Sequence, residues 1–282
     1  MISADHAIAR FRRDLALGIF ARALLLVTAV GGVVISGSRV PSGNMIGSAL
    51  MIAVMIAWLA LNRRAARRSR QVADASSLIA AGRFEEAEKE IELGLREFSL
   101  ARTVKLVGLH HLALLRHAER RYGESAILCR TLLNQRLGTM GNIARPTRLI
   151  MADALLETAD LTGAYAAITA LYQEKLSLIE AVQLQSIQLD YLSQIGAWDA
   201  MISGWREKVD MTEIMPTEAS ARAQACLALA AKKLGGTTLS TWLVSRVELL
   251  IDPARLVAQR GVLAELWPGQ LPVSGNAPAE PV

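Results

Sequence analysis

SSLIAAGRFEEAEKEIELGLREF, residues Ser76–Phe98, is the stretch that best indicates the fold of this chain. A helix is expected to end at Gly82, and a tight turn follows through Phe84. Acidic residues come directly after the turn, where negative charge interacts favourably with the N-terminal end of a helix. Apolar residues then recur every four positions on one helical face: Ala87, Ile91 and Leu95. The stretch therefore predicts two short helices packed against each other.

Similar turns recur along the chain at a near-constant interval. Equivalent positions follow one another after 38, 39, 37 and 39 residues: Phe84, Tyr122, Leu161, Trp198 and Thr237. A small residue is expected where the two helices of each unit cross, as at Ala75, Ala113, Ala152 and Ala228, although the fourth unit has Leu189 there. A constant period over five units predicts an array of helical hairpins, in which each unit packs on its neighbours.

The first turn resembles the signature of the tetratricopeptide repeat (TPR) family. Gly82, Phe84 and Ala87 match its glycine, the aromatic residue two positions later and the small residue three positions further on. The resemblance covers about residues 68–252. The family repeat has about 34 residues, so these units are longer, and glycine is kept at three of the five turns. The resemblance implies an all-α, TPR-like α-solenoid of about five helical hairpins; a relative with longer hairpins is the alternative.

In TPR proteins, the first helix of each pair lines a concave groove that holds a peptide or a helix. Carried over to this sequence, the resemblance implies these groove residues: His110, His111, His117, Asp153, Asp190, Gln194, Lys232 and Lys233. Their mixed charges show no cluster suited to capturing a C-terminal carboxylate. The class of ligand therefore stays open, and unremarkable surface positions are the alternative.

Two apolar segments precede the repeats. Leu15–Ile35 has 21 residues with one charge, Arg22, and Met45–Leu61 has 17 residues with none. A bilayer core requires about 20 helical residues, with a lower limit of about 17. We therefore predict a transmembrane hairpin over residues 15–62, with spans of about 15–37 and 45–62. A cleaved signal peptide is the alternative for the first segment, and a buried core helix is the alternative for the second.

Basic residues flank this hairpin on both sides: Arg10, Arg12, Arg13, Arg63, Arg64, Arg67, Arg68 and Arg70. The positive-inside rule then places both termini in the cytoplasm, as expected of a bacterial inner-membrane protein. We expect the basic amphipathic segment 1–14 and the juxtamembrane segment 63–70 to contact anionic lipid headgroups. Residues 1–70 carry ten basic and two acidic residues, whereas the remainder carries 21 and 24. A slightly acidic main domain argues against nucleic-acid binding.

The repeat domain is predicted over residues 71–267. No Gly or Pro lies between Gly47 and Gly82, so the second span and the first repeat helix are expected to form one helix from about Met45 to Ala81, with a flexible basic linker as the alternative. At the other end, Asp252-Pro253 should start a capping helix that runs to Pro268. This helix has Leu256, Leu263 and Trp267 on one face. The Pro-rich tail, 268–282, is expected to be disordered.

No pattern of catalytic chemistry stands out. His110 and His117 are about 10.5 Å apart along a helix, too far to share a metal ion. Cys129 and Cys226 sit in apolar helical contexts and are expected to be small core residues rather than a disulfide. A phosphate-binding glycine loop and a nucleophile motif are both missing from the sequence. We therefore expect no enzyme activity, cofactor, metal or small-molecule substrate.

The expected function is that of a membrane-anchored, cytoplasm-facing scaffold or adaptor. Its partner would be a protein, itself membrane-associated if the anchor and first repeat are rigidly joined. The layout is similar to that of HemY-like bacterial inner-membrane proteins linked to porphyrin metabolism. The alternative is a structural subunit of a transport or assembly complex, in which the hairpin makes the main contacts.

Overall fold

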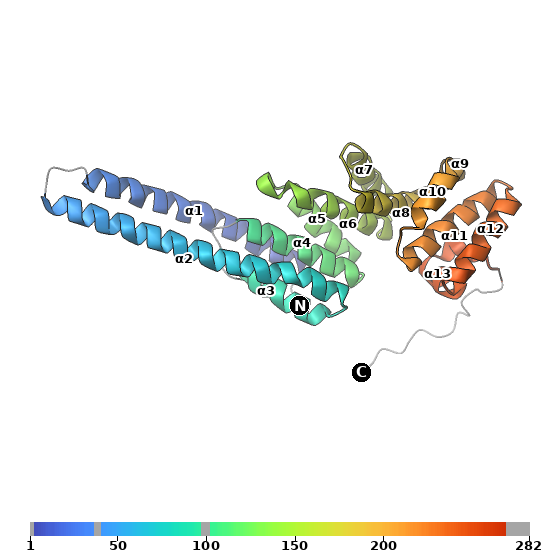
Figure 1. Cartoon of the computed structure of the whole chain (residues 1–282), viewed down its shortest axis with the longest axis horizontal. Coiled ribbons are helices and arrows are strands. Elements are labelled where there is room, and N and C mark those ends of the chain that lie inside the picture. The colour runs from blue at the N-terminus through green and yellow to red at the C-terminus, as the bar shows by residue number, and fades with distance from the viewer. Residues whose placement is uncertain (1–2, 37–40, 97–101, 269–282) are drawn as a thin grey trace. The chain divides into compact units, whose positions relative to one another are not determined.

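The structure, a computed structural model, describes residues 3–36, 41–96 and 102–268 (Figure 1). Within these ranges every regular element is a helix, so the all-α prediction is confirmed. The chain divides into two compact units, Met1–Ala159 (unit 1) and Asp160–Val282 (unit 2). The predicted repeat domain, 71–267, is distributed over both units, and its bounds stay a prediction.

Unit 1 contains two long helices followed by shorter ones that pack in sequence. The elements are α1 (Ala4–Ser36), α2 (Pro41–Ala80), α3 (Phe84–Arg96), α4 (Arg102–Ala118), α5 (Tyr122–Leu133), the 3-10 helix η1 (Gly138–Ile143) and α6 (Ala144–Glu157). Helices α1 and α2 lie side by side along the apolar part of the sequence (Figure 1). The second half of α2 then packs on α3 and α4.

Helix α2 runs without a break from Pro41 to Ala80. The prediction that the second apolar segment continues into the first repeat helix is therefore confirmed. At 1.5 Å per residue, its 40 residues span about 60 Å. A flexible basic linker, the alternative, is not seen.

The membrane prediction is supported in part. Among the described residues one helical stretch, Ala4–Gly31, is long and apolar enough to cross a membrane, and α2 contributes a shorter apolar stretch, Ile52–Leu61. Two spans are therefore not seen as such. The hairpin loop, residues 37–40, and the side chains of residues 41–48 lie outside the described part of the chain.

Unit 2 is also built of packed helices. Its elements are α7 (Leu161–Tyr172), α8 (Leu178–Gln194), α9 (Trp198–Ile202), α10 (Trp205–Thr212), α11 (Thr217–Lys233), α12 (Thr237–Leu250), α13 (Pro253–Gln259) and the 3-10 helix η2 (Gly261–Glu265). In the fourth predicted hairpin the second helix is broken into α9 and α10 at Ser203, and Gly204 there has a φ of 64°.

Each predicted turn position is the first residue of a helix: Phe84, Tyr122, Leu161, Trp198 and Thr237. Two residues earlier, the backbone is left-handed every time, at Gly82, Arg120, Ala159, Gly196 and Gly235. Four of these turns are closed by a bond from a backbone N–H to the carbonyl five residues back, for example Arg83 N to Leu78 O at 2.9 Å. This is the Schellman pattern that ends helices. The predicted period is therefore a repeat of one local turn.

The residues predicted at the helix crossings are buried. Ala75, Ala113, Ala152 and Ala228 have no exposed surface, and Leu189 is also buried. In two hairpins a serine on the second helix fixes the crossing, since Ser125 Oγ donates to Ala113 O at 2.8 Å and Ser240 Oγ donates to Ala228 O at 2.9 Å. These contacts agree with the prediction that consecutive helices pair at these positions.

The C-terminal cap differs from its prediction in shape. Asp252 accepts a bond from Ala254 N and Pro253 is the first helical residue, as expected. However, α13 ends at Gln259, and η2 replaces the rest of the predicted helix. Leu256, Leu263 and Trp267 are nevertheless all buried in the core of unit 2. Most of the predicted disordered tail, residues 269–282, lies outside the described residues.

Candidate functional site

The predicted groove residues are divided between the two units. His110, His111 and His117 are on α4 and Asp153 is on α6, all in unit 1. Asp190 and Gln194 are on α8, and Lys232 and Lys233 are on α11, all in unit 2. Their partners within each unit indicate which of them are free to meet a ligand.

His110 and His111 both make buried contacts. Thr147 Oγ1 donates to Ile143 O, so it accepts from His110 Nδ1, at 2.8 Å. Burial, followed by the effect of neighbouring His111, lowers the pKa of His110 to about 4. His111 Nδ1 donates to Val72 O at 2.7 Å, which joins α4 to α2. Burial lowers the pKa of His111 too, against the opposing effect of that bond. Both rings are therefore neutral near pH 7 and fix helix packing.

His117 and Asp153 are brought together by the fold. His117 Nε2 lies 2.8 Å from Asp153 Oδ2, and the imidazole packs edge-on against the Tyr122 ring. The pair is partly exposed and connects α4 to α6. Two of the predicted groove residues thus contact each other, and together they present one polar spot on unit 1.

In unit 2, Asp190 is buried among basic groups. Its Oδ2 lies 3.5 Å from Arg222 Nε and 3.6 Å from an Arg260 nitrogen. The Cys226 thiol lies 3.9 Å from its Oδ1. Burial and the Asp190 charge raise the pKa of Cys226 well above its usual range. The thiol is therefore protonated and unreactive at neutral pH.

The other predicted residues of unit 2 are exposed. Lys232 donates to the Glu265 carbonyl and Lys233 pairs with the Glu265 carboxylate, so both hold η2 against α11. Gln194 is exposed at the end of α8. Cys129, in unit 1, is free and buried as predicted, and burial raises the pKa of its thiol to about 12.

The first part of α1 is buried in unit 1, which the sequence analysis missed. Ala4, Ala7, Ile8 and Phe11 belong to one apolar core with residues of α2 to α5. Their spacing along one helical face was visible in the sequence, whereas the expectation of membrane-surface contact rested on the basic residues of this segment. Arg12 and Arg13, on the opposite side, are exposed, and Arg10 is half-buried. The segment is therefore a structural part of the helical unit.

Two buried charged clusters in unit 1 were also missed. Asp14 of α1 pairs with Lys105 of α4 at 2.7 Å, and Lys105 Nζ also donates to Leu95 O at 2.6 Å. Arg116 is fully buried and bonds Glu88 and Glu119, each at 2.6 Å. Burial alone would lower the pKa of Arg116, but these two carboxylates outweigh it and raise that pKa. The first cluster fixes α1 to the domain, and the second fixes α4 to α3.

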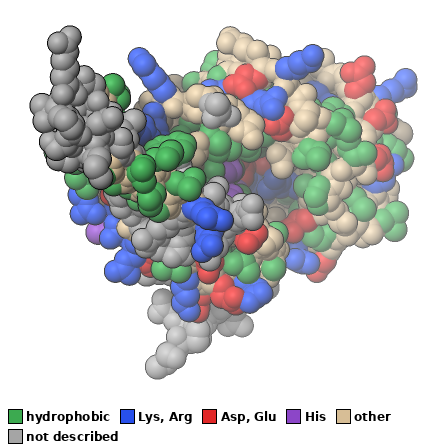
Figure 2. All heavy atoms as spheres, turned by 60° about the vertical axis from the view of Figure 1, so that its left-hand side comes forward, with side chains coloured by type: hydrophobic (Ala, Val, Ile, Leu, Met, Phe, Trp, Pro, Cys, Tyr) green, Lys and Arg blue, Asp and Glu red, His purple; other side chains and the backbone are tan. Residues whose placement is uncertain are grey.

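Beyond Asp14, the side chains of α1 are largely exposed. Large apolar residues on α1 face outward, as do several on α2: Ile19, Phe20, Leu24, Leu26, Val27, Val30, Val33, Val34, Ile52, Met55, Ile56, Trp58 and Leu59. Figure 2, turned so that this end comes forward, shows apolar side chains next to the grey residues, with Lys and Arg side chains beside them. Arg63 and Arg67 of the predicted basic segment are exposed, whereas the side chains of Arg64, Arg68 and Arg70 lie outside the described part.

Metal-binding geometry is not found in the described part of the chain, where no three His, Cys, Asp or Glu side chains come close enough to hold an ion. Comparison with family models, with curated proteins and with solved structures finds no match. Neither TPR membership nor a relationship to HemY-like proteins is supported by these comparisons. What the described part of the chain shows is an all-helical arrangement in which many helices pack on one another.

Proposed function

We propose that the chain is a membrane-anchored scaffold or adaptor, in which α1 and α2 form a two-span anchor and the TPR-like helical hairpins bind a protein partner in the cytoplasm. The membrane would be a bacterial inner membrane. The exposed apolar surface of α1 supports an anchor. Only 11% of the most apolar window of this helix is buried, whereas the core helix of a soluble protein would be mostly buried.

The buried start of α1 argues against a cleaved signal peptide. Cleavage after the apolar segment would remove Phe11 and its neighbours from the core of unit 1. It would also leave Lys105 buried without Asp14. A charge that loses its buried partner is strongly destabilising. The helix is therefore better explained as a permanent anchor.

The observation that carries the proposal is that both ends of the α1–α2 pair lie in one compact unit. Ala4–Phe11 and the end of α2, at Ala75 and Ile79, share the same core. If α1 crosses the bilayer between them, the chain must return before Ala75. Only α2 lies in that interval, which supports a second crossing by α2 despite its shorter apolar stretch. The basic residues flanking the pair then favour the cytoplasm as the shared side.

A protein partner is supported by exposed apolar side chains in unit 2. On α7 and at the start of α8, Tyr165, Tyr172, Leu178 and Ile179 are more than half exposed, Ile179 by 72%. Exposed aromatic and large aliphatic residues are typical of interface cores. By contrast, Asp190 is buried, and His110, His111 and His117 have partners within their own unit. We therefore place the contact at the α7–α8 hairpin.

Cysteine labelling tests the two-span anchor. The native thiols, Cys129 and Cys226, are buried and have raised pKa values, so they should react slowly. A Ser38→Cys variant should be labelled by a membrane-impermeant maleimide on intact cells. A Thr241→Cys variant, at an exposed position of α12, should be labelled only after permeabilisation. Labelling of both positions from one side would show that the anchor proposal is wrong.

The alternative is a structural subunit of a membrane complex, favoured by the apolar outer faces of α1 and α2. Affinity purification in mild detergent separates the two functions. A Tyr172→Ala/Ile179→Ala variant should lose the partner of a scaffold. Replacing the exposed apolar residues between Ile19 and Trp58 by leucine should lose the partner only if the spans make the contact. The second variant keeps Ala4–Asp14 and thus the core of unit 1.

A further inference from the structure

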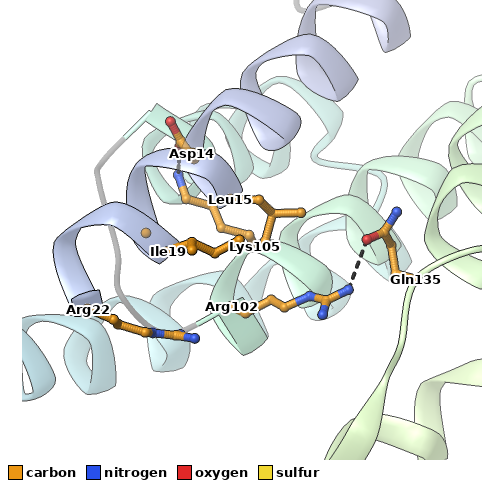
Figure 3. Close-up of a pocket in the computed structure, with 8 residues that line it drawn as sticks. Asp14, Leu15, Ile19, Arg22, Arg102, Lys105 and Gln135 are labelled. Carbon is orange, nitrogen blue, oxygen red and sulfur yellow. Dashed lines mark hydrogen bonds and ion pairs between the residues drawn. The ribbon is translucent and has the colours of Figure 1, made fainter. Parts of the chain in front are cut away.

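A basic pocket lies in unit 1 where α1 changes from buried to exposed (Figure 3). Its cavity volume is about 170 Å³. Helix α1 contributes Asp14, Ile19 and Arg22, helix α4 contributes Arg102 and Lys105, and Gln135 follows α5. Figure 3 shows Arg22 extending from α1 toward the start of α4, where Arg102 begins. Helices α1 and α4 thus contribute three basic side chains to the lining of one small space.

The electrostatics of the pocket favour an anion. The lining carries three basic groups and one carboxylate, a net charge of +2. Within this lining, Asp14 pairs with Lys105 at 2.7 Å. Arg102 donates to Gln135 Oε1 at 2.9 Å. Its Nε is buried and finds no acceptor among the described residues. An N–H donor buried without an acceptor is unfavourable, which points to an oxygen ligand at this place.

The surroundings of the pocket favour a ligand that is partly apolar. After Asp14 along α1, the outward face of the helix is formed by exposed apolar residues such as Ile19 and Phe20. Before Asp14, the side chains of Ala7 and Phe11 are buried in the core of unit 1. In a two-span anchor this transition lies at the level of the lipid headgroups. The pocket therefore has charge on the domain side and an apolar helix face on the membrane side.

Gly18 helps to keep the pocket open. It is buried and lines the cavity, and a Cβ built at this position meets no atom within 4 Å. A larger side chain at residue 18 would extend from this open position into space that a ligand could use. This position offers a test that leaves every charge in place.

We propose that this pocket binds the phosphate group of an anionic phospholipid, with Arg22 and Arg102 contacting the phosphate and the acyl chains lying along α1. The proposal rests on the proposed membrane anchor. Arginine suits this role because its planar guanidinium binds phosphate oxygens through two parallel N–H bonds. Arg22, inside the first apolar segment, thus has a specific ligand. A free phosphate ion offers the same oxygens without the acyl chains, and the test must separate these two sources.

The test uses the full chain in mild detergent, titrated with dioctanoyl phosphatidylglycerol, dioctanoyl phosphatidylcholine or sodium phosphate, with bound lipid counted by native mass spectrometry. Phosphatidylglycerol should bind best, and sodium phosphate should not displace it. Arg22→Gln and Arg102→Gln should each weaken its binding by about tenfold, since each removes a charge-assisted contact to phosphate. Gly18→Leu should weaken it to a similar extent by filling the cavity.

Arg130→Gln is the matched control, because it removes the same charge from an exposed position of α5 in the same unit. This variant should change the binding of phosphatidylglycerol by less than about twofold, because a single exposed charge contributes little. Equal binding by the wild type and the Arg22, Arg102 and Gly18 variants would overturn the pocket. Displacement by sodium phosphate at similar concentration would overturn the lipid assignment. If labelling at Ser38 contradicts the anchor while arginine-dependent binding persists, the proposed function fails and the phosphate site stands.

Discussion

The core of unit 1 and the core of unit 2 are each closed by apolar residues from one end of that unit's chain, on helices of different kinds. In unit 1 the closing residues, Ala4 to Phe11, are the first turns of α1, and the same helix continues into the exposed apolar stretch. In unit 2, Leu256, Leu263 and Trp267 lie on α13 and just after it, in short elements. Repeat arrays require such caps because a terminal hairpin exposes one apolar face. In unit 1, the residues that close the core and the apolar stretch proposed as an anchor thus belong to one helix.

The two units also differ in what they bury. Unit 1 buries three charged residues, Asp14, Lys105 and Arg116, each held by opposite charge, whereas unit 2 buries one, Asp190, among the described residues. Helix α11 of unit 2 buries mainly small residues, from Ser220 to Ala231, which allow close helix packing. All four histidines of the chain, and both turns with a left-handed residue other than glycine, belong to unit 1. Unit 1 should therefore respond more strongly than unit 2 to mutation and to pH.

The largest expected effect is that of Arg116→Ala. It leaves Glu88 and Glu119 without their buried partner, which should cost unit 1 about 3–5 kcal/mol of unfolding free energy. Hydrogen exchange measured by mass spectrometry should show faster exchange in α3 to α5 and no change in α11 and α12. Arg130→Ala, at an exposed position of α5, is the control. Equal loss of protection against hydrogen exchange in unit 1 and unit 2 would contradict the expected difference between the two units.

Phe11→Ala tests the cap of unit 1. Removing a fully buried phenylalanine should cost about 3 kcal/mol and loosen α3 and α4, since a cavity remains in their shared core. Leu263→Ala is the mirror change in unit 2, where about 2 kcal/mol is expected and only α11 to α13 should exchange faster. Unchanged exchange in α3 and α4 of the Phe11 variant would mean that the segment is no cap.

Acid should destabilise unit 1 before unit 2. The folded pKa of His110 is about 4, below the value of about 6.5 expected in the unfolded chain. Between these two pH values, His110 is protonated in the unfolded state and neutral in the folded state. The free energy of unfolding therefore falls as the pH drops from about 6.5 toward 4. One such group gives a slope of about 1.4 kcal/mol per pH unit. His111, whose pKa is also lowered, acts in the same direction.

Urea unfolding at a series of pH values, followed by hydrogen exchange in each unit, measures this slope. His110→Asn removes the titrating ring and should flatten it, because Asn does not titrate in this range. Earlier loss of protection in unit 2, which has no histidine, would contradict the prediction.

The smallest expected effect is a gain. Arg120 and Ala159 have φ values of 62° and 60°, where a side chain is strained and glycine is not. Replacing either residue by glycine should stabilise unit 1 by about 0.5–1 kcal/mol. Gly235→Ala should destabilise unit 2 by about the same amount, because its φ is 78°. Thermal unfolding followed by circular dichroism checks both signs, and a stability loss in the Ala159 variant would contradict the strain argument.

Much of the helical arrangement was predictable from residues close together in the sequence. Gly82 and Phe84 defined a turn whose spacing located the later ones, even where Arg120 and Ala159 replace glycine. This worked because left-handed turns and apolar periodicity depend on neighbours within about five residues. The break between α9 and α10 and the shortened α13 were not predicted. Helix ends of this kind respond to packing as well as to local propensity.

The candidate sites were less predictable. The basic flanks suggested membrane contact for residues 1–14, but the apolar side of this segment is buried in unit 1. The sequence around Asp14 and around Lys105 does not indicate that the two side chains form an ion pair, because 91 positions separate them. His111 similarly bonds a carbonyl on α2, 39 residues away. Such pairs form only when helices have already packed.

The amino-acid sequence by itself therefore determined the helices, their turns and the apolar segments, because backbone conformation and hydropathy are properties of short stretches. Tertiary structure alone decided which charges are buried, which residues cap unit 1 and where Arg22 and Arg102 face a common pocket. The physical reason is the cost of removing charged groups from water. A buried charge such as Lys105 or Arg116 is tolerated only where packing brings an opposite charge to it, and that partner comes from a distant part of the chain.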